Sequence, residues 1–98
     1  MVVVRNVFRL KFGKAREAQE AVKNILAVSR RIGLAEPGRV MTDVTGPFYT
    51  LVHELTFPEL ADLERMQQNM SDPAWKDAYA KFVPLVESGY REIFRVVE

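Results

Sequence analysis

The chain has 98 residues, 48% of them hydrophobic and 28% charged, which is typical of a single globular domain spanning residues 1–98. Its 14 Lys and Arg residues against 13 Asp and Glu residues leave a net charge of +1, which provides no broad attraction for nucleic acid. It has no cysteine, which excludes disulfides and thiolate metal sites, and it has neither a signal-peptide core nor about 18 consecutive apolar residues, so we expect a cytoplasmic protein without a membrane span.

Two different periods of apolar residues predict the first two elements. Residues 2–12 alternate, and their even positions form the more apolar side, on which Asn6 is the polar exception. Gly13 breaks this strand, and residues 14–32 then carry apolar side chains at steps of three and four, which predicts an amphipathic helix. Gly33 is the expected C-terminal stop of that helix.

The middle of the chain predicts a hairpin. Residues 39–45 and 48–57 have strand patterns, and only Gly46-Pro47 lies between them, which indicates a tight turn joining antiparallel neighbours. The strand at 48–57 contains the only histidine of the chain, His53.

Two helices and a strand are predicted after the hairpin. Pro58 fits the first position of a helix with an apolar stripe, and Asp72-Pro73 reads as the N-cap and first turn of a second helix. Pro84 should kink or end that second helix. The alternation of residues 90–97 after Gly89 predicts a last strand.

The resulting order β-α-β-β-α-α-β is that of a ferredoxin-like α+β fold, with four antiparallel strands and the helices on one face. The more apolar sides of the first and third strands should face the helices, and these include Asn6 and His53. The opposite face mixes apolar and charged residues: Val3, Val7, Phe48 and Val52 with Arg5, Arg9, Thr50 and Glu54. This face is either the surface of a monomer or, as the thin core of a short chain favours, covered by the sheet of a second copy in a homodimer.

Three segments of the chain resemble the NIPSNAP family. FRLKFGKAREA at residues 8–18 is similar to its strand-to-helix opening, and SDPAWKDAYAKFVPLVESGYREIFR at 71–95 is similar to its DPEW-like helix start, PLVE-like helix end and final strand. ELTFPELADLERM at 54–66 extends the match, whereas Phe12 replaces a usual proline and Asn6 stands near where an arginine is common. The resemblance implies a homodimeric α+β barrel with no established common chemistry.

The candidate site is a cleft between sheet and helices. His53 lacks a second histidine or a cysteine, and Glu54 beside it points to the other face, so we expect no metal site. Asn6 and His53 should lie on adjacent strands beneath Trp75 and Tyr79, and these four are the candidate substrate-binding residues. The alternative is a purely structural role, in which a neighbour satisfies the hydrogen bonds of Asn6, His53 is a hydrogen-bonded core residue, and Trp75 and Tyr79 pack in the core.

The function expected from this arrangement is the binding of a small, partly aromatic molecule. The resemblance to the dimeric α+β barrel superfamily adds an enzymatic alternative, a cofactor-free monooxygenase-like or isomerase-like protein. Haem-degrading members place a histidine after their tryptophan, and none follows Trp75, so we expect no haem or other cofactor. An RNA-binding module is disfavoured, because Val3 and Thr50 stand where its stacking aromatic residues would be and only Phe48 remains.

Two geometric predictions test the assignment of faces. Glu54 should lie within salt-bridge reach of Arg5 or Arg9, on the face away from the helices, where these residues and Asp43 would form ion pairs or bind an acidic ligand. His53 should face the helices near Asn6, mostly buried and hydrogen-bonded.

Overall fold

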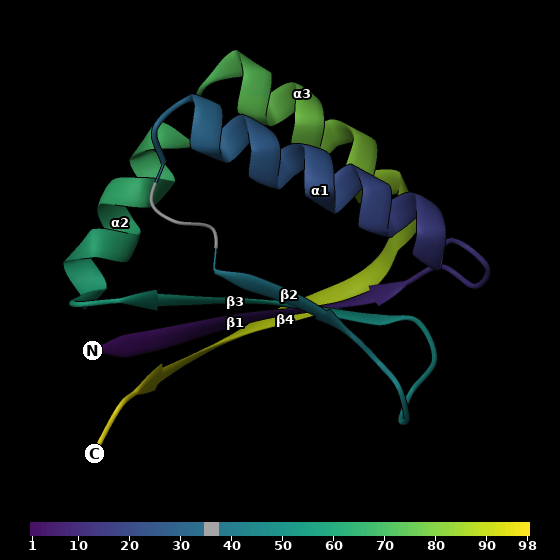
Figure 1. The fold of residues 1–98 in the computed structure, drawn as a ribbon, viewed down its shortest axis with the longest axis horizontal. Coiled ribbons are helices and arrows are strands. Elements are labelled where there is room, and N and C mark those ends of the chain that lie inside the picture. The colour runs from purple at the N-terminus through teal and green to yellow at the C-terminus, as the bar shows by residue number, and fades with distance from the viewer. Residues whose placement is uncertain (35–37) are drawn as a thin grey trace.

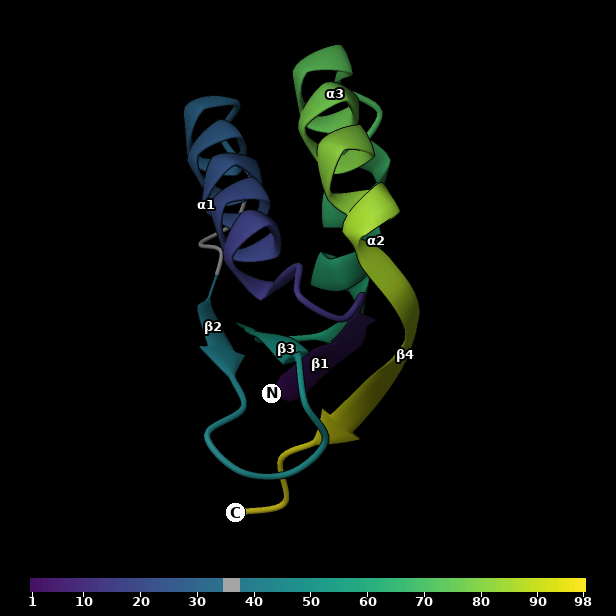
Figure 2. The same ribbon diagram turned by 90° about the vertical axis from the view of Figure 1, so that its right-hand side faces the viewer.

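The computed structural model describes residues 1–34 and 38–98, and in this part of the chain the elements follow the predicted order. The strands are β1 (Val2–Leu10), β2 (Arg39–Thr42), β3 (Thr50–Phe57) and β4 (Val86–Arg95); the helices are α1 (Ala15–Arg31), α2 (Leu60–Asn69) and α3 (Pro73–Phe82), which a 3₁₀ turn at Val83–Leu85 follows. The strands form an antiparallel sheet in the order β2-β3-β1-β4, with the helices on one side (Figure 1; Figure 2). The ferredoxin-like α+β fold is thus confirmed.

Helix α1 ends at the predicted glycine. Gly33 has a φ of 78°, in the left-handed region that glycine adopts without steric cost. Its N–H donates to the carbonyl of Arg30 at 3.2 Å, and the N–H of Leu34 donates to the carbonyl of Ser29 at 3.0 Å. This pair of hydrogen bonds is the Schellman motif, which satisfies carbonyls that the helix itself leaves unpaired.

Two other helix boundaries follow from capping residues. Asp72 is the N-cap of α3 as predicted, because its carboxylate accepts the N–H of Ala74 at 2.8 Å. Helix α2 begins two residues later than predicted: its first residue is Leu60, and Glu59 is the N-cap in a capping box with Asp62. Pro84 lies in the 3₁₀ turn that ends α3, as expected for a residue without an N–H.

The connection between β2 and β3 is longer than predicted. Residues 43–49 form a loop, so the expected two-residue turn is wrong. Tyr49 has a φ of 59°, which a strand residue cannot have, and the N–H of Thr50 donates to the Asp43 carboxylate at 2.8 Å. The Asp43 side chain thus replaces a strand-to-strand backbone contact and opens the hairpin.

The last strand begins earlier than predicted. It starts at Val86, and Gly89 lies within it, opposite Phe8, instead of preceding it. A Cβ atom at Gly89 would lie 3.0 Å from the carbonyl oxygen of Val7 and 3.1 Å from the Phe8 ring. Glycine at this position therefore permits close approach of two strands and does not mark the end of a turn.

The side chains between helices and sheet form two clusters at opposite ends of the sheet. One cluster joins α2 to the sheet and consists of Val2, Val4, Leu55, Phe57, Leu63 and Met66. The other joins α1 and α3 to the sheet and consists of Leu10, Ala18, Val22, Leu51 and Phe82. In Figure 1, α1 and α3 rise from the sheet toward α2, so the layers diverge between the clusters.

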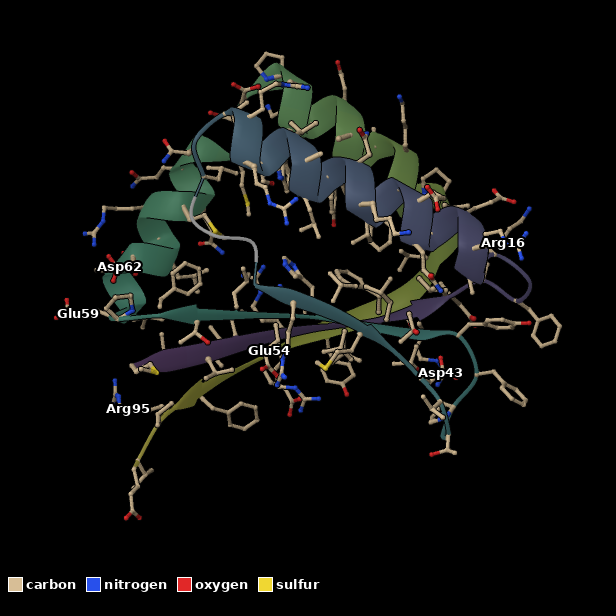
Figure 3. All side chains as sticks on the ribbon, viewed as in Figure 1. Arg16, Asp43, Glu54, Glu59, Asp62 and Arg95 are labelled. Carbon is tan, nitrogen blue, oxygen red and sulfur yellow. The ribbon has the colours of Figure 1, made fainter. Side chains whose placement is uncertain are left out.

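The face of the sheet away from the helices, here called the open face, carries a row of charges across the four strands. The register aligns Arg39, Glu54, Arg5 and Glu92. Arg39 Nη2 lies 2.8 Å from Glu54 Oε1, Arg5 Nε 3.7 Å from Glu54 Oε2, and Arg5 Nη1 3.7 Å from Glu92 Oε1. Figure 3 shows Glu54 on this face, so its predicted position near Arg5 is confirmed.

Candidate functional site

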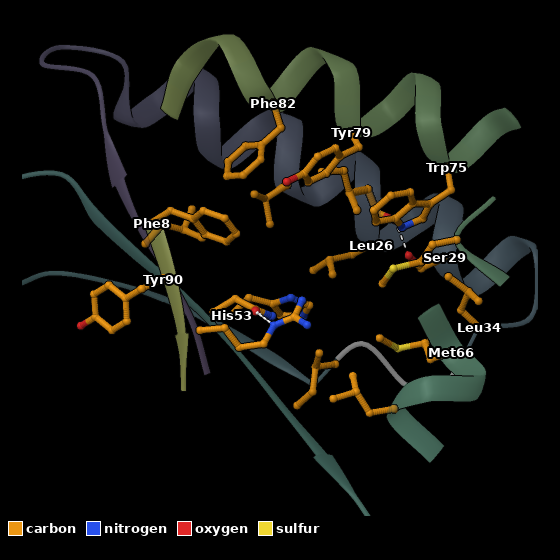
Figure 4. A pocket seen from close by; sticks show the side chains of 18 residues that line it. Phe8, Leu26, Ser29, Leu34, His53, Met66, Trp75, Tyr79, Phe82 and Tyr90 are labelled. Carbon is orange, nitrogen blue, oxygen red and sulfur yellow. Dashed lines mark hydrogen bonds between the residues drawn. The ribbon is translucent and has the colours of Figure 1, made fainter. Parts of the chain in front are cut away.

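A cavity of about 460 Å³ lies between the sheet and the helices. It occupies the space between the two apolar clusters, where α1 and α3 stand away from the strands and α2 lies across one end (Figure 4). Its volume is within the range of about 300 to 1,000 Å³ of small-molecule sites. The divergence of the two layers thus leaves space of a size that a ligand can use.

Aromatic side chains of α3 form the roof of the cavity. Trp75 and Tyr79 are one helical turn apart and stack with their ring centroids 5.0 Å apart and their planes at 11°. Phe82 continues this face of the helix and meets Phe8 of the sheet edge-on, with centroids 5.1 Å apart. Figure 4 shows the rings of Trp75 and Tyr79 above the cavity, opposite His53. The stacked pair gives the roof a flat apolar surface.

A row of polar side chains crosses the floor of the cavity. His53 of β3, Asn6 of β1 and Arg91 of β4 are direct partners in the register of the sheet, and all three line the cavity. Arg91 Nε donates a hydrogen bond to Asn6 Oδ1 at 2.7 Å. The neighbouring rows on the same side are apolar, since Val4 pairs with Leu55 and Phe8 with Leu51. Among the described strand residues, this row thus supplies hydrogen-bonding groups between apolar rows.

The structure brings the four candidate residues together on one cavity: Asn6, His53, Trp75 and Tyr79. His53 faces the helices and is the cross-strand partner of Asn6, as predicted, and it is partly buried. Tyr79 is 37% exposed, so its ring borders the opening of the cavity as well as its roof. A role of these residues in binding stays a prediction.

Arg91 and Ser29 also line the cavity, and the sequence pattern did not indicate either of them. In the last strand, Arg91 and Arg95 alternate with Tyr90, Glu92 and Phe94, so neither side is clearly the apolar one. Only the pairing of Arg91 with Asn6 assigns it to the helix-facing side. Ser29 lies in a helical stripe of apolar residues, and its hydroxyl donates to the Ile25 carbonyl at 2.8 Å.

Two further features of the described residues bear on function. No three His, Cys, Asp or Glu side chains are grouped there so as to hold a metal ion. No helix in this part of the chain has the length and apolar character needed to cross a membrane.

Comparison with solved structures places the chain among proteins of the same fold. A protein from Agrobacterium tumefaciens is 26% identical with a TM-score of 0.84, over 97% of this chain and 92% of that one. An uncharacterised NIPSNAP domain protein from Burkholderia xenovorans is 17% identical with a TM-score of 0.83, over 99% and 95% of the two chains. A candidate antibiotic biosynthesis monooxygenase from Nitrosomonas europaea is 13% identical with a TM-score of 0.76, over 100% of both chains.

Comparisons at the level of sequence give a more specific result. No curated protein matches the chain. The family model named NIPSNAP matches residues 4–98, which is nearly the whole length, and it covers the three segments in which the family resemblance was found. On this match, together with the shared fold, the chain belongs to the NIPSNAP family.

Proposed function

We propose that this protein binds a small, partly aromatic molecule in the cavity between its sheet and its helices. The cavity carries the proposal, because it combines a volume of about 460 Å³ with mainly apolar walls and a single polar row. The stacked rings of Trp75 and Tyr79 offer a flat surface to a ring of the ligand. Asn6 and His53 offer hydrogen-bonding groups on the opposite side, so that the ligand is oriented as well as enclosed.

Native mass spectrometry of protein released directly from cells tests the binding of a small molecule. The wild-type protein is expected to retain a ligand that is lost on denaturation. Leu26→Trp should abolish retention, because Leu26 lines the cavity and a larger ring there fills it. Ala27→Trp is the control, since Ala27 is exposed on the same helix. A wild-type protein without ligand, or a Leu26→Trp protein that retains as much, contradicts the proposal.

We also propose a homodimer in which the open faces of two sheets pack together. The support is the amount of apolar surface on this face: Tyr90 and Phe94 are 60% and 48% exposed, and Val52 is half-buried. The row of alternating charges is already paired within one chain, which lowers the cost of covering it. The expected buried area is about 1,200 to 2,000 Å² or more.

Sedimentation velocity at micromolar concentration tests the dimer. Val52→Asp should yield a monomer, because it places a carboxylate in the middle of the proposed interface. Val44→Asp is the control, since Val44 is 97% exposed in the loop between β2 and β3 and lies outside the sheet. A wild-type protein that sediments as a monomer contradicts this assembly.

The enzymatic alternative is a cofactor-free, monooxygenase-like or isomerase-like reaction in the same cavity. It is supported by His53, a titratable side chain that lines the cavity beside Asn6 and opposite the aromatic roof. An imidazole at this position is placed to take a proton from an acidic group of a substrate. If the protein is an enzyme, His53→Gln should retain the ligand found in the wild type and lose its conversion. If the wild-type protein is incubated in air and its ligand is recovered unchanged, the enzymatic alternative is contradicted and ligand binding is the function.

A further inference from the structure

We infer that Arg91 binds an anionic group of the ligand, so that the cavity selects small amphipathic monocarboxylates over neutral molecules of the same shape. The inference rests on the proposed function, the binding of a small molecule in this cavity, and adds the chemical class of that molecule. The position of Arg91 beside the cavity is known only from the structure, because the sequence pattern did not assign this residue to the cavity.

In the described part of the chain, the guanidinium of Arg91 has a hydrogen-bond partner that orients it but no carboxylate that neutralises it. Its Nε–H donates to Asn6 Oδ1 at 2.7 Å, which fixes the plane of the group beside the cavity floor. Within residues 1–34 and 38–98, no carboxylate forms an ion pair with Arg91. The terminal amino groups therefore keep N–H donors in the planar arrangement that matches the two oxygens of a carboxylate.

Arg91 differs in this respect from the arginines at the same level of the sheet. Arg5 and Arg39 lie on the open face and both pair with Glu54. Arg5 also approaches Glu92 at 3.7 Å. At this level of the sheet the open face thus pairs both of its arginines within the chain, whereas among the described residues that line the cavity Arg91 is a cation without a carboxylate partner.

The rest of the cavity lining favours the same class of ligand. No Asp or Glu is among the described residues that line it, and Arg91 is the one Lys or Arg in that set. Arg91 is exposed on the edge strand β4, so its guanidinium borders the cavity from the solvent side, while the aromatic roof and aliphatic walls can receive the apolar body of a ligand. A single guanidinium matches one negative charge better than the charge of about −2 of a phosphate monoester. A monocarboxylate with a ring or short alkyl body fits both parts of the site.

Pairs of probes that differ only in charge test the inference. We would measure binding of 2-naphthoate and 2-naphthamide, and of 4-phenylbutyrate and its amide, by isothermal titration calorimetry at low salt. The wild type should bind each acid more tightly than its amide. Arg91→Gln should weaken binding of the acids about 10- to 100-fold, the range expected for loss of a charge-assisted hydrogen bond, and leave the amides unchanged. Arg91→Lys should keep part of the preference for acids over amides, because lysine keeps the positive charge but lacks the paired N–H donors of a planar guanidinium.

Arg95→Gln is the matched control, since it removes the same charge from an exposed position of the same strand outside the cavity lining. It should bind acids and amides like the wild type. If the wild type and Arg91→Gln each bind an acid and its amide equally well, the preference for anions is overturned, and the proposed binding of small molecules in the cavity still stands. Equal losses in the Arg91 and Arg95 variants would overturn the assignment to Arg91. Failure of every probe to bind the wild type would overturn both the inference and the proposed binding of such molecules.

Discussion

Replacing Glu54 by glutamine tests the row of charges on the open face. Glu54 Oε1 accepts hydrogen bonds from Arg39 Nε at 3.1 Å and from Arg39 Nη2 at 2.8 Å, and Oε2 lies 3.7 Å from Arg5 Nε. The Glu54 side chain is 19% exposed, whereas those of Arg39 and Arg5 are 70% and 39% exposed. In a single chain, solvent screening at the arginines limits each ion pair to about 1 kcal/mol or less.

A second contribution comes from Arg5. Its Nε is buried and has no hydrogen-bond partner among the described residues, so the nearby Glu54 charge is the main compensation for its loss of water. Glutamine keeps the shape of the side chain and removes that charge. We therefore expect Glu54→Gln to lower the free energy of unfolding by about 1 to 2 kcal/mol, which corresponds to about 4 to 16 °C in melting temperature for a domain of this size.

Urea unfolding at pH 7 and fixed protein concentration, followed by circular dichroism, measures this change. Glu20→Gln is the control, because Glu20 and Lys23 form an ion pair at 3.6 Å with side chains that are 70% and 71% exposed. This control should change the stability by less than about 0.5 kcal/mol. A loss in Glu54→Gln no larger than that in Glu20→Gln would refute the idea that partial burial makes the Glu54 row contribute to stability.

Two further predictions concern the backbone. Asp72→Ala should cost about 1 kcal/mol in thermal unfolding, because the N–H of Ala74 loses its acceptor at 2.8 Å, whereas Asp72→Asn should be nearly neutral; equal losses would exclude the cap as the cause. Gly38→Ala should destabilise the protein much more than Gly13→Ala, since both positions have a positive φ but only at Gly38 does a Cβ atom collide with the carbonyl of Glu54. The strain at Gly13 alone should cost about 1 to 3 kcal/mol, and a similar loss at both positions would contradict the collision.

The order of elements and the faces of the strands could be predicted from the sequence because both depend on local periods. A strand places alternate side chains on opposite faces, so the apolar neighbours of His53 were enough to orient it toward the helices. The same rule placed Glu54 on the open face near Arg5. Helix ends were predicted wherever a capping residue is explicit, as at Gly33 and Asp72.

Two of the features that were predicted wrongly are the start of β4 and the loop between β2 and β3. The first depends on pairing with a strand that is distant in the chain, and the second depends on a hydrogen bond made by a side chain. Gly89 resembles a turn residue in the sequence, yet it lies inside β4 because β4 pairs with β1 on both sides of it, with Phe8 opposite Gly89. The hairpin turn resembles a two-residue connection, yet the Asp43 carboxylate takes the N–H of Thr50 and lengthens the loop. Neither contact leaves a periodic signal in the sequence.

The position of Asn6, His53, Trp75 and Tyr79 between the sheet and the last helix could be predicted from the sequence, because the backbone sets the parity of a strand and the spacing of a helix face. The sequence does not show that a cavity separates Asn6 and His53 from the stacked rings of Trp75 and Tyr79. The separation of the two layers depends on side chains of all the helices, which support the layers at two ends and leave the middle apart. Arg91 could be placed only by the pairing of β4 with β1, since its own strand has no clearly apolar side from which to orient it.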